Sequence, residues 1–128
     1  MLEKAIVIDD DELVNESLCE LLEIMEINVV DRGVDGKDAV ELFVKHMPDY
    51  TLVDLNMPNF DGFYAVEQIR KLDTNALVFV ITGDTTVESK INLENLGVTG
   101  IIYKPFKIEE LVDRLRAAKS NAKAGMAA

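Results

Sequence analysis

Carboxylates follow two largely apolar segments of the chain, and they are the first side chains whose positions could support chemistry. Asp9 and Asp10 come directly after residues 5–8, and Asp54 comes directly after residues 50–53. Short apolar runs that end in turn-forming residues are typical of strands buried on both faces of a parallel sheet. The carboxyl ends of such strands border the crevice where open α/β sheets bind ligands. The sequence therefore predicts that these three aspartates meet at one edge of a sheet.

Three converging carboxylates need a positive partner, because each pair about 4 Å apart repels by roughly 4 kcal/mol at an effective dielectric near 20. Magnesium takes oxygen ligands and is commonly held by one or two carboxylates together with a phosphate. Thr82 and Lys104 end two later apolar runs, so they add a hydroxyl donor and a cation that could pair with a phosphoryl oxygen. Together these groups indicate magnesium-dependent phosphoryl transfer, in which catalysis is mostly positioning and charge neutralisation.

Strand-like segments alternate with helical segments along the chain, and this alternation must position the groups described above. The expected strands are residues 5–8, 28–32, 50–53, 77–81 and 100–103, and an amphipathic helical pattern follows each of them. The pattern predicts an α/β fold: a doubly wound, five-stranded parallel sheet with right-handed crossovers and five helices. Residues 5–8, 50–53 and 77–81 are the most apolar, which favours the strand order 2-1-3-4-5.

Composition restricts the partners. The 128 residues fit one domain, which we expect to occupy residues 1–119, with 120–128 as a flexible tail. A net charge of -11 argues against nucleic acid and anionic membranes as partners and favours cations. The apolar runs are too short for a signal sequence or a membrane span. The single cysteine, Cys19, offers no disulfide, so we expect a cytoplasmic protein.

Motifs at the strand ends resemble those of the receiver domain of two-component response regulators, in particular its CheY-like single-domain type. They are Ile8-Asp9-Asp10, Val53-Asp54-Leu55-Asn56-Met57-Pro58, Asp61-Gly62, Thr82-Gly83 and Tyr103-Lys104-Pro105-Phe106. Each motif is weak alone, but all of them in this order are specific. The resemblance runs from about residue 4 to residue 118. It implies a stand-alone signalling switch that catalyses only its own phosphorylation and dephosphorylation and is not otherwise an enzyme.

The resemblance assigns roles to the residues of the acidic edge. Asp54 would accept a phosphoryl group from a sensor histidine kinase or a phosphotransfer protein. Asp10 and Asp54 would bind Mg²⁺ directly, Asp9 largely through water, and Asn56 through its backbone carbonyl. Lys104 would pair with the phosphoryl group. The resemblance therefore implies Mg²⁺ as the cofactor and one aspartate as the phosphorylated residue.

The resemblance also implies a switch that carries the signal to the surface. Thr82 would turn inward to hydrogen-bond the phosphoryl group, and Tyr103 would follow it from an outward to an inward rotamer. This motion would change the surface made by the fourth helix, fifth strand and fifth helix, where a downstream protein would bind. The peptide bond between Lys104 and Pro105 would be cis, which would aim the lysine at the site.

Two polar residues occupy the positions that tune dephosphorylation in this family. Asn56 and Asp84 would lie beside the phosphoryl group, where their side chains could orient the attacking water. We therefore expect a short-lived phosphoryl group. Gly83 replaces the alanine that most often follows the threonine, and the polar fourth helix makes the flagellar-motor partner of CheY an uncertain guide to the target.

Two other functions share part of the pattern. A phosphatase of the haloacid dehalogenase kind also uses a strand-end aspartate and magnesium, but its Asp-x-Asp motif belongs on the first strand, whereas Asp54-Leu55-Asn56 follows the third. A pseudo-receiver would keep the fold and bind a partner without phosphorylation. A nucleotide or flavin domain fits less well, because no glycine-rich loop follows the first strand.

Overall fold

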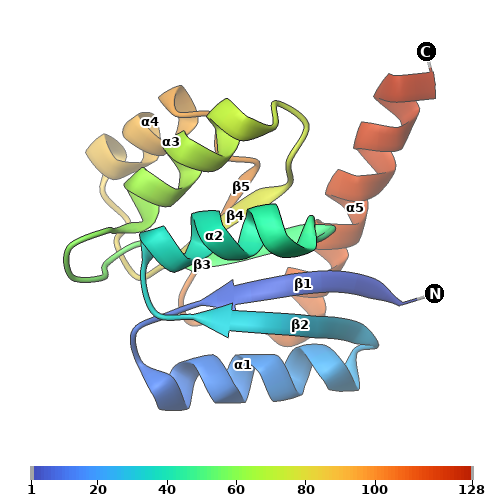
Figure 1. Ribbon diagram of the computed structural model, residues 1–128, viewed down its shortest axis with the longest axis horizontal. Coiled ribbons are helices and arrows are strands. Elements are labelled where there is room, and N and C mark those ends of the chain that lie inside the picture. Colours follow the sequence, from blue (N-terminus) through green and yellow to red (C-terminus); the bar gives the residue numbers. More distant parts are fainter. Residues whose placement is uncertain (1, 128) are drawn as a thin grey trace.

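The computed structural model describes residues 2–127, and side chains as far as residue 123. Strands and helices alternate along the chain: β1 (Glu3–Ile8), α1 (Glu12–Ile24), β2 (Ile27–Gly33), α2 (Gly36–His46), β3 (Tyr50–Asp54), α3 (Gly62–Leu72), β4 (Val78–Thr82), α4 (Val87–Asn95), β5 (Gly100–Tyr103) and α5 (Ile108–Ala127). The strands form one parallel sheet in the order β2-β1-β3-β4-β5 (Figure 1). The predicted doubly wound α/β fold and its strand order are confirmed.

Helices cover both faces of the sheet, and alternate residues of each central strand pack against them. In β1, Ile6 and Ile8 belong to the core under α2, α3 and α4, whereas Ala5 and Val7 belong to the core under α1 and α5. Every residue of β4 is buried, and β3 is buried until Asp54. The apolar runs thus mark the central strands because those strands have no face in contact with water.

The last helix is longer than the sequence pattern indicated. Helix α5 continues to Ala127, so residues 120–127, which were expected to form a flexible tail, are helical in the structure. Residue 128 lies outside the described residues. Alanine and lysine favour the helical backbone without an apolar periodicity, so the pattern of buried residues did not reveal this extension. Where the domain itself ends stays a prediction.

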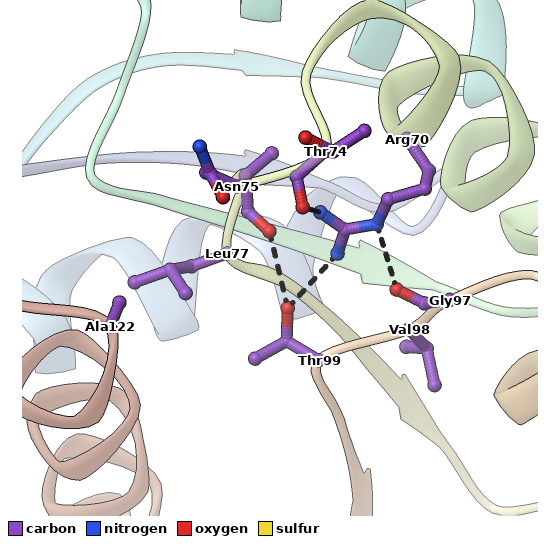
Figure 2. A pocket seen from close by; sticks show the side chains of 9 residues that line it. Arg70, Thr74, Asn75, Leu77, Gly97, Val98, Thr99 and Ala122 are labelled. Carbon is purple, nitrogen blue, oxygen red and sulfur yellow. Dashed lines mark hydrogen bonds between the residues drawn. The ribbon is translucent and has the colours of Figure 1, made fainter. Parts of the chain in front are cut away.

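The amino edge of the sheet is tied together by Arg70 of α3. Its Nε donates to the Gly97 carbonyl (2.9 Å), one Nη donates to the Thr74 carbonyl (2.8 Å), and the other donates to Thr99 Oγ1 (3.3 Å). Thr99 Oγ1 also accepts from the backbone N–H of Val78 at 2.9 Å. Arg70, Thr74, Gly97 and Thr99 line a pocket of about 550 Å³ (Figure 2). One guanidinium thereby fixes the loops that begin β4 and β5.

Candidate functional site

The register of the sheet brings the predicted site residues together at its carboxyl edge. β3 lies between β1 and β4, and β5 pairs with β4. The paired residues nearest this edge are Ile8 with Val53, Asp54 with Ile81, and Thr82 with Tyr103. The residues that follow these strands are therefore neighbours in space.

Asp9, Asp10 and Asp54 form an acidic cluster in which one ligand oxygen from each lies within 4.8 Å of the others. Lys104 faces the cluster, with its Nζ 3.0 Å from Asp54 Oδ1 and 4.0 Å from Asp9 Oδ2. Asp9 is buried, and this burial raises the pKa of its carboxyl above the usual value, although the N–H of Asp11 donates to it. The negative charge of Asp54 acts in the same direction as burial. The cluster therefore concentrates more negative charge than its lysine balances.

The donor set of this cluster fits Mg²⁺. All three side chains offer carboxylate oxygens, the ligands that Mg²⁺ prefers. Three carboxylates facing one ammonium leave two negative charges, which match a divalent cation. Asp10 is exposed and Asp54 is partly exposed, so a bound ion could keep several of its waters. The side chain of Asn56 is exposed, and the predicted role of its backbone carbonyl stays a prediction.

Local contacts explain how the chain holds these aspartates. Asn15 of α1 is buried, and its Nδ2 donates to the carbonyls of Asp9 (3.3 Å) and Gly33 (3.1 Å), which fixes the ends of β1 and β2. Asn15 was not among the predicted site residues, although a polar residue among the apolar residues of a helix is a visible signal. A Cβ on Gly62 would lie 2.8 Å from the Asp54 carbonyl oxygen, so α3 begins too close to β3 for a larger residue.

The predicted switch residues, Thr82 and Tyr103, lie at the carboxyl ends of β4 and β5. The Thr82 side chain is buried, and its Oγ1 accepts a hydrogen bond from the Asp84 N–H at 3.0 Å. Tyr103 is paired with Thr82 in the sheet and is 36% exposed. The backbone N–H of Lys104 donates to the Thr82 carbonyl at 2.9 Å, and the peptide bond between Lys104 and Pro105 is cis.

Asp84 has contacts that the sequence did not indicate. Its carboxylate accepts from the Thr86 N–H (2.9 Å) and from the Ser89 hydroxyl (2.6 Å), both in the first turn of α4 or its cap. The Ser89 hydroxyl and the Thr86 N–H hold the pKa of Asp84 below its usual value. The carboxylate is therefore bound to the start of α4 by contacts that favour its ionised form. No sequence pattern distinguishes Ser89, because serine is common on polar helical faces.

The structure combines a doubly wound sheet with an acidic cluster and a lysine at its carboxyl edge, and comparison with known proteins gives the family. The family model described as response regulator receiver domain matches residues 5–116. This chain therefore belongs to the response regulator receiver family. Members of this family are signalling domains that bind Mg²⁺ at an acidic pocket and interact with histidine kinases and downstream targets.

Some relatives that match the chain are about as long as the chain, and others are about twice as long. The chemotaxis protein CheY of Halobacterium salinarum is 30% identical over 115 residues, which cover 90% of this chain and 95% of that protein. The response regulator MprA of Mycolicibacterium vanbaalenii is 32% identical over 114 residues, which cover 89% of this chain but 49% of MprA. The chain thus spans about half the length of MprA and of other curated relatives it matches.

Solved structures share the fold. A CheY-like receiver domain protein from Methanospirillum hungatei superposes with a TM-score of 0.90 at 19% identity, covering 98% of this chain and 99% of that one. CheY of Borrelia burgdorferi, in its complex with CheX, BeF₃ and Mg²⁺, superposes with a TM-score of 0.84 at 23% identity, covering 90% of this chain and 87% of that one. Within residues 2–127, no helix is long and apolar enough to cross a membrane.

Proposed function

We propose that Asp54 accepts a phosphoryl group from a sensor histidine kinase or a phosphotransfer protein, and that this modification changes the affinity of the domain for a separate downstream protein. The contact between Lys104 Nζ and Asp54 Oδ1, at 3.0 Å within the acidic cluster, carries the proposal. This contact places a cation where the charge of a transferred phosphoryl group would need to be balanced.

The proposed reaction is a transfer between a phosphohistidine and the Asp54 carboxylate. An oxygen of Asp54 bonds to phosphorus, the P–N bond of the donor breaks, and its electron pair returns to the imidazole. Lys104 pairs with a phosphoryl oxygen, and the Thr82 hydroxyl donates to another. Magnesium bound by Asp9, Asp10, Asp54 and the Asn56 carbonyl would supply further charge neutralisation. The remaining residues position the acceptor.

The signal would leave the site through Thr82 and Tyr103. When the Thr82 hydroxyl turns toward the phosphoryl group, the ring of Tyr103, which is exposed in this structure and paired with Thr82 in the sheet, would turn inward after it. The surface of α4, β5 and α5 would then change and bind the downstream protein with a different affinity. A coupling free energy of about 1–3 kcal/mol is typical of such linkage. Equal partner affinity with and without phosphorylation would contradict this step.

Intact-mass spectrometry tests the phosphorylation itself. We expect the protein to gain one phosphoryl group from acetyl phosphate when Mg²⁺ is present and not when it is chelated. The Asp54→Asn variant should gain none. Asp113→Asn, the same change at an exposed position of α5, serves as the matched control and should behave like the wild type. A wild-type protein that takes up no phosphoryl group, sampled fast enough to detect a labile adduct, would instead indicate a pseudo-receiver.

A further inference from the structure

Hydrogen bonds run in a chain from Thr82, at the end of β4, to Ser89 in α4. The backbone N–H of Asp84 donates to Thr82 Oγ1 (3.0 Å), and the Thr86 N–H donates to Asp84 Oδ1 (2.9 Å). The Ser89 hydroxyl donates to the other carboxylate oxygen, Asp84 Oδ2, at 2.6 Å. Asp84 therefore connects the residue that would bind the phosphoryl group to the first turn of α4.

Three hydrogen bonds orient Asp84, and α4 itself buries few of its side chains. Leu93 is buried in α4, whereas Val87 and Ile91 are 70% and 49% exposed. A Cβ on Gly83 would meet nothing within 4 Å among the described residues, so no neighbouring group packs against the loop at this position. The backbone of Asp84 is tied to Thr82, and the Ser89 hydroxyl is one of the donors, together with Thr86, that turn its carboxylate toward α4.

We propose that Ser89 is a positioning residue that holds the Asp84 carboxylate on α4 and thereby lengthens the lifetime of the phosphoryl group on Asp54. This inference rests on the proposed function. An ionised carboxylate beside a phosphoryl group can accept a proton from the attacking water and speed hydrolysis. The hydrogen bond from Ser89 holds the Asp84 carboxylate on α4, where it would not accept the proton of the attacking water. Asp84 was expected to shorten the lifetime of the phosphoryl group, and Ser89 would reduce this effect.

Hydrolysis of the acyl phosphate is the step that Ser89 would slow. The oxygen of a water molecule bonds to phosphorus, and the bond between phosphorus and the Asp54 oxygen breaks. Its electron pair returns to the Asp54 carboxylate, and inorganic phosphate leaves. The proton that the water loses passes to the Asp84 carboxylate, when that carboxylate is free to turn inward, and then to solvent. Water is the one co-reactant that this step needs.

The Ser89→Ala variant tests the inference. The protein is loaded from acetyl phosphate with Mg²⁺, the donor is removed, and the loss of the phosphoryl group is followed by intact mass. We expect this loss to be about fivefold faster in Ser89→Ala, a fraction of the roughly 100-fold effect of a fully placed general base. Ser89→Thr keeps the hydroxyl and should restore the wild-type rate. Ser120→Ala, the same change at an exposed position of α5, is the matched control.

A double variant distinguishes positioning from a general loosening of α4. In an Asp84→Ala background, Ser89→Ala should not change the rate of loss, because the carboxylate that it would release is gone. Two results would overturn the inference: an equal acceleration with and without Asp84, or a phosphoryl lifetime that Ser89→Ala does not shorten. A wild-type protein that takes up no phosphoryl group would overturn the proposed function and this inference together. The two kinds of failure are thus distinguishable.

Discussion

The two edges of the sheet both carry charged side chains, but they arrange these charges in opposite ways. At the carboxyl edge, ligand oxygens of Asp9, Asp10 and Asp54 lie within 4.8 Å of one another, and Lys104 forms ion pairs with Asp9 and Asp54. Like charges at this distance repel, so the arrangement costs stability unless a cation is bound. Such a cluster is typical of a functional site, where a bound ligand balances the charge.

At the amino edge two acids each face a base of their own. Arg116 Nε lies 3.0 Å from Glu3 Oε1, and Lys119 Nζ lies 3.0 Å from Asp49 Oδ1. The Tyr50 hydroxyl also donates to Glu3. These pairs join α5 to β1 and to the loop before β3, and Arg70 joins two further loops on the same edge (Figure 2). The difference indicates that the amino edge contributes stability, whereas the carboxyl edge gives up stability for function.

Removal of the Arg70 side chain should have the largest effect on stability. Arg70→Ala leaves the carbonyls of Gly97 and Thr74 without a charged donor, so we expect the free energy of unfolding to fall by about 3 kcal/mol. Urea titration measures this change. Lys71→Ala is the control, because Lys71 pairs with Glu67 on the exposed face of α3 and such pairs contribute little.

The same variant also tests the division between the edges. At urea concentrations below its unfolding transition, the Arg70→Ala protein should still take up a phosphoryl group from acetyl phosphate at the wild-type rate. An Arg70→Ala protein that is folded but cannot be phosphorylated would show that the amino edge also serves the reaction. A stability equal to that of Lys71→Ala would show that the Arg70 network contributes nothing.

The Glu3 contacts at the amino edge should make stability depend on pH. Burial alone would raise the pKa of Glu3, but the hydrogen bonds from Tyr50 and Arg116 outweigh it and hold this pKa below the ordinary value of 4.5. A carboxyl whose pKa is lower in the folded state contributes stability above its unfolded pKa, and this contribution is lost as pH falls through the folded pKa. We therefore expect Glu3→Gln to lower stability at pH 7 by about 1 kcal/mol and less below pH 4.5.

Thermal unfolding at pH 7 and at a series of lower pH values measures the effect of Glu3→Gln. Glu41→Gln, at an exposed position of α2, is the matched control and should change stability little at any of these pH values. If the difference in stability between Glu3→Gln and the wild type is as large below pH 4.5 as it is at pH 7, ionisation of Glu3 is not what stabilises this edge.

The sequence predicted the strand order and the acidic cluster because both follow from local patterns. The central strands β1, β3 and β4 are buried on both faces, so their apolar runs are visible along the chain. The functional aspartates lie directly after two of these runs, and the parallel sheet places strand ends side by side. Once the strand order is known, the meeting of Asp9 and Asp54 requires no knowledge of side-chain packing.

Other contacts depend on how loops and helices pack, and the sequence pattern does not contain that information. Ser89 lies among other polar residues of α4, so its hydrogen bond to Asp84 becomes visible only when the path of the loop is known. Arg70 and Thr99 are far apart along the chain and meet because two loops converge at the amino edge. The helix over residues 120–127 comes from backbone propensity, which the search for apolar periodicity does not detect.

Neutralisation of Asp10 should have the smallest effect on stability but the most informative sign. Asp10→Asn removes one of three clustered negative charges, and we expect the free energy of unfolding without Mg²⁺ to rise by about 0.5 kcal/mol, because Asp10 is exposed and screened. With Mg²⁺ the order should reverse, since the wild type binds the ion more tightly and gains more stability from binding. Urea titrations with Mg²⁺ and with a chelator measure both values.

Glu20→Gln, at an exposed position of α1, is the matched control for Asp10→Asn and should give the same change with and without Mg²⁺. If Asp10→Asn lowers stability in the chelator, the cluster is not repulsive and the two edges do not differ as we argue. If Asp10→Asn raises stability but gains as much from Mg²⁺ as the wild type, the repulsion is real and the ion does not bind at Asp10. A reversal of sign with Mg²⁺ would tie the instability of the carboxyl edge to the ligand that relieves it.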